Sequence, residues 1–398
     1  MAAPLLIWDP AMLEYDLGGA HPLHPLHPLR WKLTWDLADR LGVLTGLDRF
    51  APPPADDDAL AAIHTRRYIE AVKAASGRAE RSGHRLVGHG LGTQDNPVFE
   101  HMHRASALIA GGSIAAAKAI AGGEVDRAVN IAGGLHHAMA DSASGFCVYN
   151  DAALAIAALL AAGVGRVAYI DVDVHHGDGV QAAFYDDPRV LTVSIHESPL
   201  SLWPGTGWPM ETGSGAAAGT SVNIPVPAGT SDAGWLRAFT AVVPSVVRAF
   251  RPDVLVTQHG ADSHAEDPLA DLDLSVDGHL ASYRALRNLA EQITGGRWLA
   301  LGGGGYSPVR VVPRSWTHLL AVVADRDVDP STVLPDGWLD AARTERPDIE
   351  PPVRMTDDAA VDFQPWHGVA EVPVDAAIAE VRRLIHPLHG LDPFDPRD

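Results

Sequence analysis

The chain has one cysteine and far fewer basic than acidic residues. Because Cys147 is alone, the chain can form neither an intrachain disulfide framework nor a cysteine-based zinc site. We interpret it as a small buried residue. The formal net charge of −20 argues against nonspecific binding to nucleic acid or to an anionic membrane. We therefore expect no nucleic acid and no membrane among the partners, and the composition leaves the oligomeric state open.

Long apolar runs are also missing. No stretch approaches the roughly 20 apolar residues that span a bilayer. The N-terminus, MAAPLLIWDP, lacks the basic segment and long apolar core of a secretion signal. These features predict a cytoplasmic enzyme, and 398 residues are enough for a large core.

Apolar runs and amphipathic stretches alternate along the chain. Strands are predicted at 128–134, 166–170, 190–196, 253–258 and 297–301, and helices at 57–76, 98–121, 151–162, 232–250 and 277–294. This alternation predicts an α/β protein with a mostly parallel central sheet and helices on both faces. Segment 197–231 is predicted to be a long functional loop. The pattern weakens near residue 323, so we expect a catalytic domain at 1–323. A C-terminal extension, 324–398, should flank the core, with a late helix near 374–386.

The segment DVDVHHGDG follows the predicted strand 166–170. If the strand alternation continues, Asp171, Asp173 and His175 share one face, while the valines between them point into packing. Burying several carboxylates without partners costs several kcal/mol each. A divalent cation is the simplest compensating group.

Three other predicted strands also end in polar groups. Strand 128–134 is followed by His136 and His137, strand 253–258 is followed by Asp262, and strand 297–301 is followed by four glycines and Tyr306. Ligands bind at the carboxyl ends of strands in open parallel sheets. We therefore expect these groups to converge.

Together these groups suit an amide hydrolase. Two aspartates and one histidine leave a coordination position for water, as in catalytic metal sites. His137 is a candidate general base, with Asp171 and Asp178 available to orient the tandem histidines. Tyr306 is a candidate donor to a developing oxyanion. The histidine repeat HPLHPLHPL at 21–29 is interpreted as an extended loop with exposed rings.

The motifs GGLHHA, SGFC, DVDVHHGDG, GADSHAEDPL and LGGGGY resemble the histone deacetylase superfamily in order and spacing. HPLR, LTWDL and LGTQDNPVF look like its bacterial acetoin-utilisation branch. The resemblance covers about residues 5–320 and implies the arginase/deacetylase α/β fold.

The resemblance also implies roles for individual residues. The metal, usually zinc and sometimes ferrous iron, would be held by Asp173, His175 and Asp262. The tandem catalytic histidines would be His136 and His137, and Tyr306 would polarise the carbonyl. A structural potassium ion would be held by Asp171, Asp173, His175, Ser194 and the backbone near Ile195.

The family's acyl-lysine tunnel is lined by two aromatic residues. Phe146, after Gly145, matches the first, and Trp203 stands where a phenylalanine is common. Polyamine-selective members can carry an acidic gatekeeper after the Asp-Pro pair, and Leu269 occupies that position here. This neutral residue favours acetyl-lysine in proteins over acetylpolyamines or other small acetylated amines, although acetylpolyamine enzymes without that acid also exist.

Two further classes are disfavoured. A binuclear-manganese ureohydrolase expects a carboxylate at Gly177, and a non-enzymatic binding module would not need every catalytic position.

Overall fold

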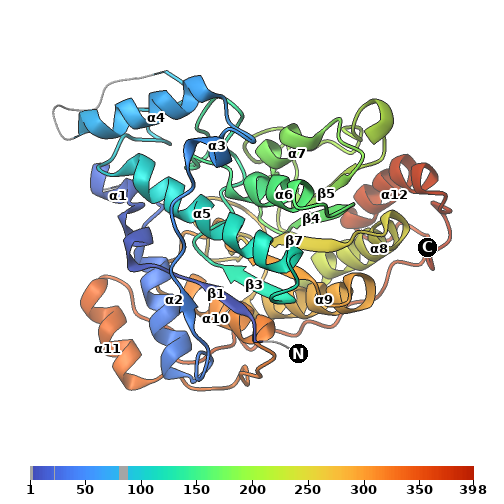
Figure 1. The fold of residues 1–398 in the computed structure, drawn as a ribbon. Coiled ribbons are helices and arrows are strands. Elements are labelled where there is room, and N and C mark those ends of the chain that lie inside the picture. The colour runs from blue at the N-terminus through green and yellow to red at the C-terminus, as the bar shows by residue number, and fades with distance from the viewer. Residues whose placement is uncertain (1–2, 22, 80–87) are drawn as a thin grey trace.

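The computed structural model describes residues 3–21, 23–79 and 88–398, and its centre is a sheet of eight parallel strands (Figure 1). The strand order across the sheet is β2-β1-β3-β8-β7-β4-β5-β6. The strands are β1 (Leu5–Ile7), β2 (Arg49–Phe50), β3 (Arg127–Asn130), β4 (Val167–Asp171), β5 (Val190–Glu197), β6 (Ser221–Val226), β7 (Val254–Gln258) and β8 (Trp298–Leu301).

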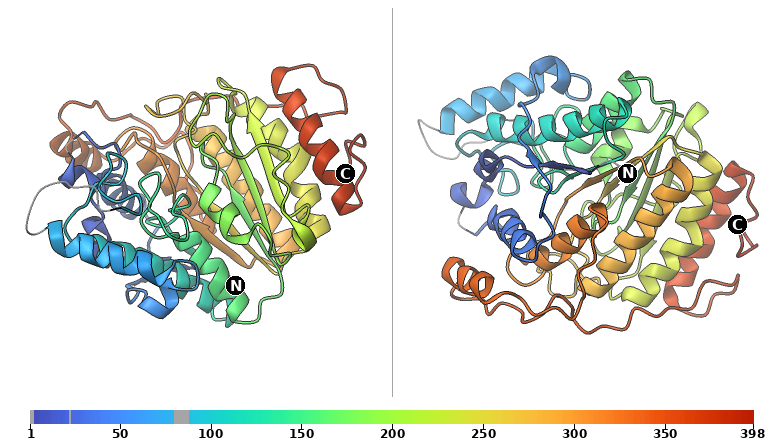
Figure 2. Two further views of the ribbon diagram at one scale, coloured as in Figure 1. Left: turned by 90° about the horizontal axis from the view of Figure 1, so that it is seen from above. Right: turned by 60° about the horizontal axis from the view of Figure 1, so that its bottom comes forward.

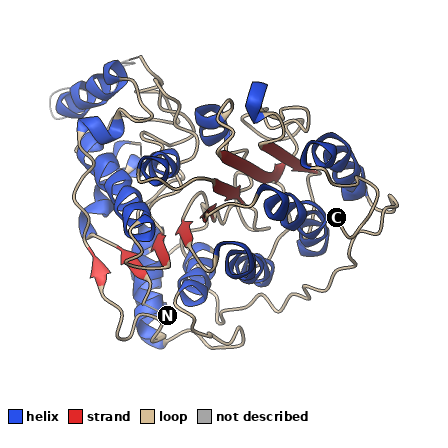
Figure 3. Ribbon diagram, turned by 45° about the vertical axis from the view of Figure 1, so that its right-hand side comes forward, coloured by secondary structure: helices blue, strands red, loops and turns tan. Residues whose placement is uncertain are grey.

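Helices cover both faces of this sheet (Figures 2 and 3). On one side α5 packs against α6, and on the other α8, α9 and α10 pack in series, with α2 against α10 and α12 against α8. The helices are α1 (Leu17–Ala20), α2 (Leu29–Arg40), α3 (Asp57–Leu60), α4 (Arg66–Ala79), α5 (Met102–Ala121), α6 (Asp151–Ala161), α7 (Asp178–Phe184), α8 (Asp232–Phe250), α9 (Val276–Thr294), α10 (Val312–Val323), α11 (Asp336–Glu345) and α12 (Pro373–Ile385). Short 3-10 helices lie at Pro10–Glu14, Gly215–Ala217 and His386–His389.

The strand order explains why the functional loops meet. Every residue of β3, β4, β5, β7 and β8 is buried, as expected for parallel strands covered on both faces. These five strands are consecutive in the sheet and run in the same direction. Their carboxyl ends therefore lie at one edge, where the sequence places its polar motifs. The predicted fold is confirmed.

Some sequence predictions are wrong in detail. The strand predicted at 128–134 ends at Asn130, and the helix predicted at 98–121 begins at Met102. Stretch 57–76 forms two helices, α3 and α4, because a turn between them directs His64 inward. Nδ1 of His64 lies 3.0 Å from the Met139 carbonyl oxygen, and Nε2 accepts the Asn150 backbone N–H. The predicted loop 197–231 contains the strand β6. Pro225 obscures this strand in the sequence, yet β6 is an edge strand of the sheet, where a missing N–H is tolerated.

Residues 324–398, predicted to be a C-terminal extension, contain α11 as well as the predicted late helix, which is α12. Helix α11 contacts α2, and α12 contacts α8 and β6. Arg237 in α8 forms a buried ion pair with Asp375 at 2.6 Å. Among the described residues, no helix is long and apolar enough to cross a membrane.

Candidate metal centre and catalytic pocket

Three buried side chains converge beyond the ends of β4 and β7. The ligand-capable atoms of Asp173, His175 and Asp262 all lie within 4.8 Å of one another. His175 Nδ1 is 3.2 Å from Asp173 Oδ1 and 3.1 Å from Asp262 Oδ2. β4 ends at Asp171, so the alternation expected through His175 is wrong. A turn instead brings His175 back onto Asp173, whose Oδ1 accepts the His175 backbone N–H.

This donor set fits a divalent cation. Burial opposes a charge on His175, but its contacts with Asp173 and Asp262 outweigh burial and raise the pKa of the ring to about 10. Burial and the nearby charge of Asp173 raise the pKa of Asp262 to about 6. Two buried carboxylates this close therefore need a positive charge between them. A cation bound by two carboxylate oxygens and one ring nitrogen would supply that charge.

Hydrogen bonds from behind fix both carboxylates. Gln258 Nε2 and Gly304 N donate to Asp173 Oδ2 at 2.7 and 2.9 Å, and Val174 N donates to Asp262 Oδ1 at 3.1 Å. The other carboxylate oxygens, Asp173 Oδ1 and Asp262 Oδ2, face His175. Sequence reasoning missed Gln258, whose only signal is a polar residue at the end of a predicted apolar strand.

Two histidine–aspartate pairs lie beside this group. His136 Nδ1–H donates to Asp171 Oδ2 and His137 Nδ1–H donates to Asp178 Oδ1, both at 2.7 Å. Tyr169 donates a further hydrogen bond to Asp171 at 2.6 Å. The two histidine Nε2 atoms are 2.9 Å apart. Because both Nδ1 atoms carry hydrogen, a single proton is shared between the Nε2 atoms.

The two rings differ in basicity. Burial opposes a charge on His136, but Asp171 and Asp173 outweigh it and raise its pKa to about 9. Burial and the positive charge of His136 lower the pKa of His137 to about 4. His136 is therefore the more basic ring of the pair and His137 the less basic one. Such a pair is suited to accept one proton and deliver another.

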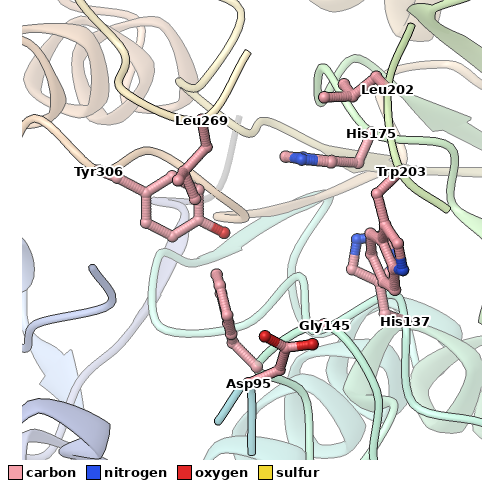
Figure 4. A pocket seen from close by; sticks show the side chains of 9 residues that line it. Asp95, His137, Gly145, His175, Leu202, Trp203, Leu269 and Tyr306 are labelled. Carbon is pink, nitrogen blue, oxygen red and sulfur yellow. The ribbon is translucent and has the colours of Figure 1, made fainter. Parts of the chain in front are cut away.

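Tyr306 stands on the opposite side of the pocket, and its hydroxyl points into the pocket (Figure 4). A Cβ at Gly304 would come within 1.9 Å of Asp262 Oδ2, so only glycine lets this backbone pass the metal-ligand group. Arg30 is buried and donates to the carbonyls of Gly303 and Gly305 at 2.8 and 3.2 Å. The tetraglycine loop is thus held by side chains rather than by its own conformational preference.

A small pocket is lined by three of these groups, His137, His175 and Tyr306. Its volume of about 260 Å³ lies below the roughly 300–1,000 Å³ usual for drug-sized ligands, so it suits a small substrate group. The nine lining residues are Asp95, His137, Gly145, Phe146, His175, Leu202, Trp203, Leu269 and Tyr306 (Figure 4).

Aromatic rings form much of this pocket. Trp203 packs edge-on to His137, with ring centroids 4.6 Å apart, and Phe146 packs edge-on to Tyr306 at 5.5 Å. A Cβ at Gly145 would lie 2.5 Å from the His137 ring and 2.6 Å from Trp203. Glycine is therefore required for this close contact.

Phe146 itself has a left-handed backbone, with φ of 67°. Such a conformation costs a non-glycine residue about 1–3 kcal/mol and is typical of functional sites. The Tyr15 hydroxyl donates to the Phe146 carbonyl at 2.6 Å and accepts the Val148 N–H at 3.2 Å. These contacts hold the strained residue in the pocket.

The histidine repeat contradicts the expectation of exposed rings. His24 is buried, packs edge-on to Phe146 at 4.5 Å, and is 3.2 Å from the Asp95 carbonyl oxygen. Burial lowers the pKa of His24. Sequence reasoning also missed the pocket residue Asp95, whose only signal is its place in LGTQDNPVF.

The remaining predicted residues are placed as follows. Ser194 is the register partner of Asp171 on the neighbouring strand, and Ile195 follows it in the core. Buried Cys147 donates to the Gly145 carbonyl at 3.2 Å, and burial raises the pKa of its thiol. These features fit a small buried residue.

Comparisons with known proteins agree with this geometry. Residues 24–323 match the family model of the histone deacetylase domain. The chain is 39% identical over 339 residues to the acetoin utilization protein AcuC of Bacillus subtilis (strain 168), covering 85% of this chain and 86% of that protein. It is 38% identical over 333 residues to AcuC of Staphylococcus aureus (strain MSSA476), covering 84% of each.

Two solved structures share the fold. A crystal structure of an HDAC homolog complexed with SAHA has a TM-score of 0.81 and 29% identity, covering 96% of this chain and 100% of that chain. The HDA15 HD domain has a TM-score of 0.71 and 30% identity, covering 80% of this chain and 90% of that chain. With the family model matching most of its length, the chain belongs to the histone deacetylase superfamily, in its AcuC-like branch.

Proposed function

We propose that this family member is a metal-dependent hydrolase that removes acetyl groups from acetyl-lysine in proteins. The observation that carries the proposal is the pocket itself. Its walls include Phe146, Trp203 and Leu269, and His137, His175 and Tyr306 also line it. A linear, uncharged acetyl-lysine side chain fits walls of this kind without leaving a buried charge unpaired.

The chain's own residues divide the chemistry as follows. The aromatic walls orient the acyl-lysine stem, and the Tyr306 hydroxyl donates a hydrogen bond to the oxyanion as it develops. His137, the ring that lines the pocket, relays protons between the pocket and the more basic His136, which is the proton reserve for the leaving amine. Asp171 and Asp178 keep both rings oriented through Nδ1.

We propose Zn²⁺ or Fe²⁺ at Asp173, His175 and Asp262. When bound, such an ion supplies Lewis acidity at the acetyl carbonyl and activates water for attack. We also propose a structural K⁺ held by Asp171, Asp173, His175, Ser194 and the backbone at Ile195, where β4 and β5 lie side by side.

Acetylpolyamines and other small acetylated amines are the second candidate class. The observation in their favour is Asp95, an acidic residue that lines the pocket and is suited to pair with a second ammonium group. The same carboxylate is equally suited to accept backbone N–H groups of a peptide. Asp95 therefore supports both classes, whereas Leu269 favours acetyl-lysine.

The two classes are separated by one comparison. Steady-state turnover is measured with one enzyme preparation on an acetyl-lysine peptide, acetylspermidine, acetylputrescine and longer acyl-lysine peptides. We expect the acetyl-lysine peptide to give the highest kcat/KM. A higher kcat/KM on an acetylpolyamine would replace the proposal with the second class, and no turnover on any of them would overturn both.

A further inference from the structure

We propose that Asp267 is a positioning residue that holds Tyr306 and Leu269 in place on the pocket wall. The buried Asp267 carboxylate accepts the Tyr306 backbone N–H through Oδ2 at 2.7 Å and the Leu269 backbone N–H through Oδ1 at 3.0 Å. Both partners line the pocket, and Asp267 does not. One carboxylate therefore joins the candidate oxyanion donor to the candidate gatekeeper, and this inference rests on the proposed function.

Tyr306 needs such an anchor because of what precedes it. Gly303 and Gly305 have φ of 158° and 123°, and glycine has little conformational preference of its own. Arg30 binds the carbonyls of both glycines, which fixes the loop before the tyrosine. The contact with Asp267 is made at the backbone N–H of Tyr306 itself, so it fixes the backbone position from which the tyrosine side chain extends.

Asp267 is in turn fixed by its own loop. Its backbone N–H donates to the His264 carbonyl at 2.8 Å, and the preceding Glu266 forms an ion pair with Arg310 at 2.6 Å. The same loop begins at Asp262. The candidate metal ligand Asp262 and Asp267 are therefore held in one loop. Through its bond to Asp267, Tyr306 is positioned relative to the candidate metal ligands. A misplacement of 1 Å can cost about 10²-fold in rate.

The test is a double-mutant cycle. Asp267→Asn replaces one acceptor oxygen by an NH₂ group, so one of the two backbone N–H groups loses its partner. If the carboxylate acts through Tyr306, kcat should fall about 10- to 100-fold, with KM and metal content changing little. In a Tyr306→Phe background the same substitution should cost less than about threefold, because the affected hydroxyl is already gone. An equal cost in both backgrounds would overturn the proposal.

The matched control is Asp271→Asn, an exposed aspartate of the same loop, which should leave kcat unchanged. If Asp267→Asn does not fold, the smaller Asp267→Ser enters the same cycle. Hydrogen exchange at the Tyr306 amide gives a readout that needs no turnover. Followed at both the Tyr306 and the Leu269 amide, exchange should accelerate at least tenfold at the amide that loses its partner in the Asp267 variant and at neither in the control, and unchanged exchange at both would refute the contacts. Wild-type enzyme without turnover on any acetylated amine would instead refute the proposed function, and the exchange measurement would still decide the role of Asp267.

Discussion

Asp357, in the predicted C-terminal extension, lies 2.9 Å from Nε2 of His264, and His264 stands two residues after the candidate metal ligand Asp262. The same carboxylate accepts hydrogen bonds from Arg314 at 2.7 Å and from the Val276 backbone N–H at 2.8 Å. The extension is thus attached to the loop that carries part of the metal-ligand group. The structure of the HDAC homolog matches 96% of the chain, so that match also includes residues beyond 323.

We predict that Asp357→Asn lowers the free energy of unfolding by about 1–2 kcal/mol near neutral pH, since the side chain is a quarter exposed and solvent screens its ion pair. Burial opposes the charge on Asp357, but the His264 hydrogen bond and the Arg314 charge outweigh it and hold its pKa well below the usual value. A lowered pKa in the folded state gives stability that is present above the unfolded-state pKa of about 4 and is lost as pH falls below it.

Urea unfolding at pH 3 to 7 checks this prediction. The difference between wild type and variant should be constant from about pH 5 to 7 and should shrink below about pH 4. Asp358→Asn, an exposed neighbour, is the control and should unfold like wild type. A pH-independent difference would show that Asp357 contributes through its shape and not through its charge.

Removing one candidate metal ligand should abolish activity. Asp262→Ala leaves Asp173 and His175, which are too few donors to hold the ion in catalytic geometry. We expect loss of most bound metal and of turnover, with the fold retained as judged by circular dichroism. Metal content is measured by elemental analysis of the purified variant. Full metal content together with near-normal turnover would exclude this ligand assignment.

Tyr306→Phe tests the oxyanion donor. The substitution removes only the hydroxyl, which should stabilise the tetrahedral state more than the bound substrate. We expect kcat to fall about 10²- to 10³-fold with little change in KM. Steady-state kinetics on the best substrate measure both constants, and a change confined to KM would place Tyr306 outside the catalytic group.

Much of the fold and of the pocket is predictable because it depends on local pattern. Apolar strands followed by polar residues place His137, Asp173 and Tyr306 at one edge of a parallel sheet. By contrast, Asp267 and Asp357 bond to groups 39 and 93 residues away. No local periodicity encodes such pairings, so those anchors emerge only from the folded chain. Strand β6 escapes prediction for a different reason, because Pro225 makes an edge strand look like a loop.

The last prediction concerns selectivity at Leu269. With leucine in the pocket wall, the internal ammonium of acetylspermidine gains no partner there, and desolvating it is costly. Leu269→Glu places a carboxylate in a partly dry channel, where a close opposite charge is worth on the order of 1–3 kcal/mol. We expect the kcat/KM ratio of acetylspermidine to acetyl-lysine peptide to rise about 5- to 150-fold. Leu269→Gln, similar in size but uncharged, should leave the ratio within about threefold of wild type. An equal rise with glutamine would mean that the polarity or shape of residue 269, and not its charge, determines the substrate ratio. An unchanged ratio with glutamate would refute the gatekeeper hypothesis.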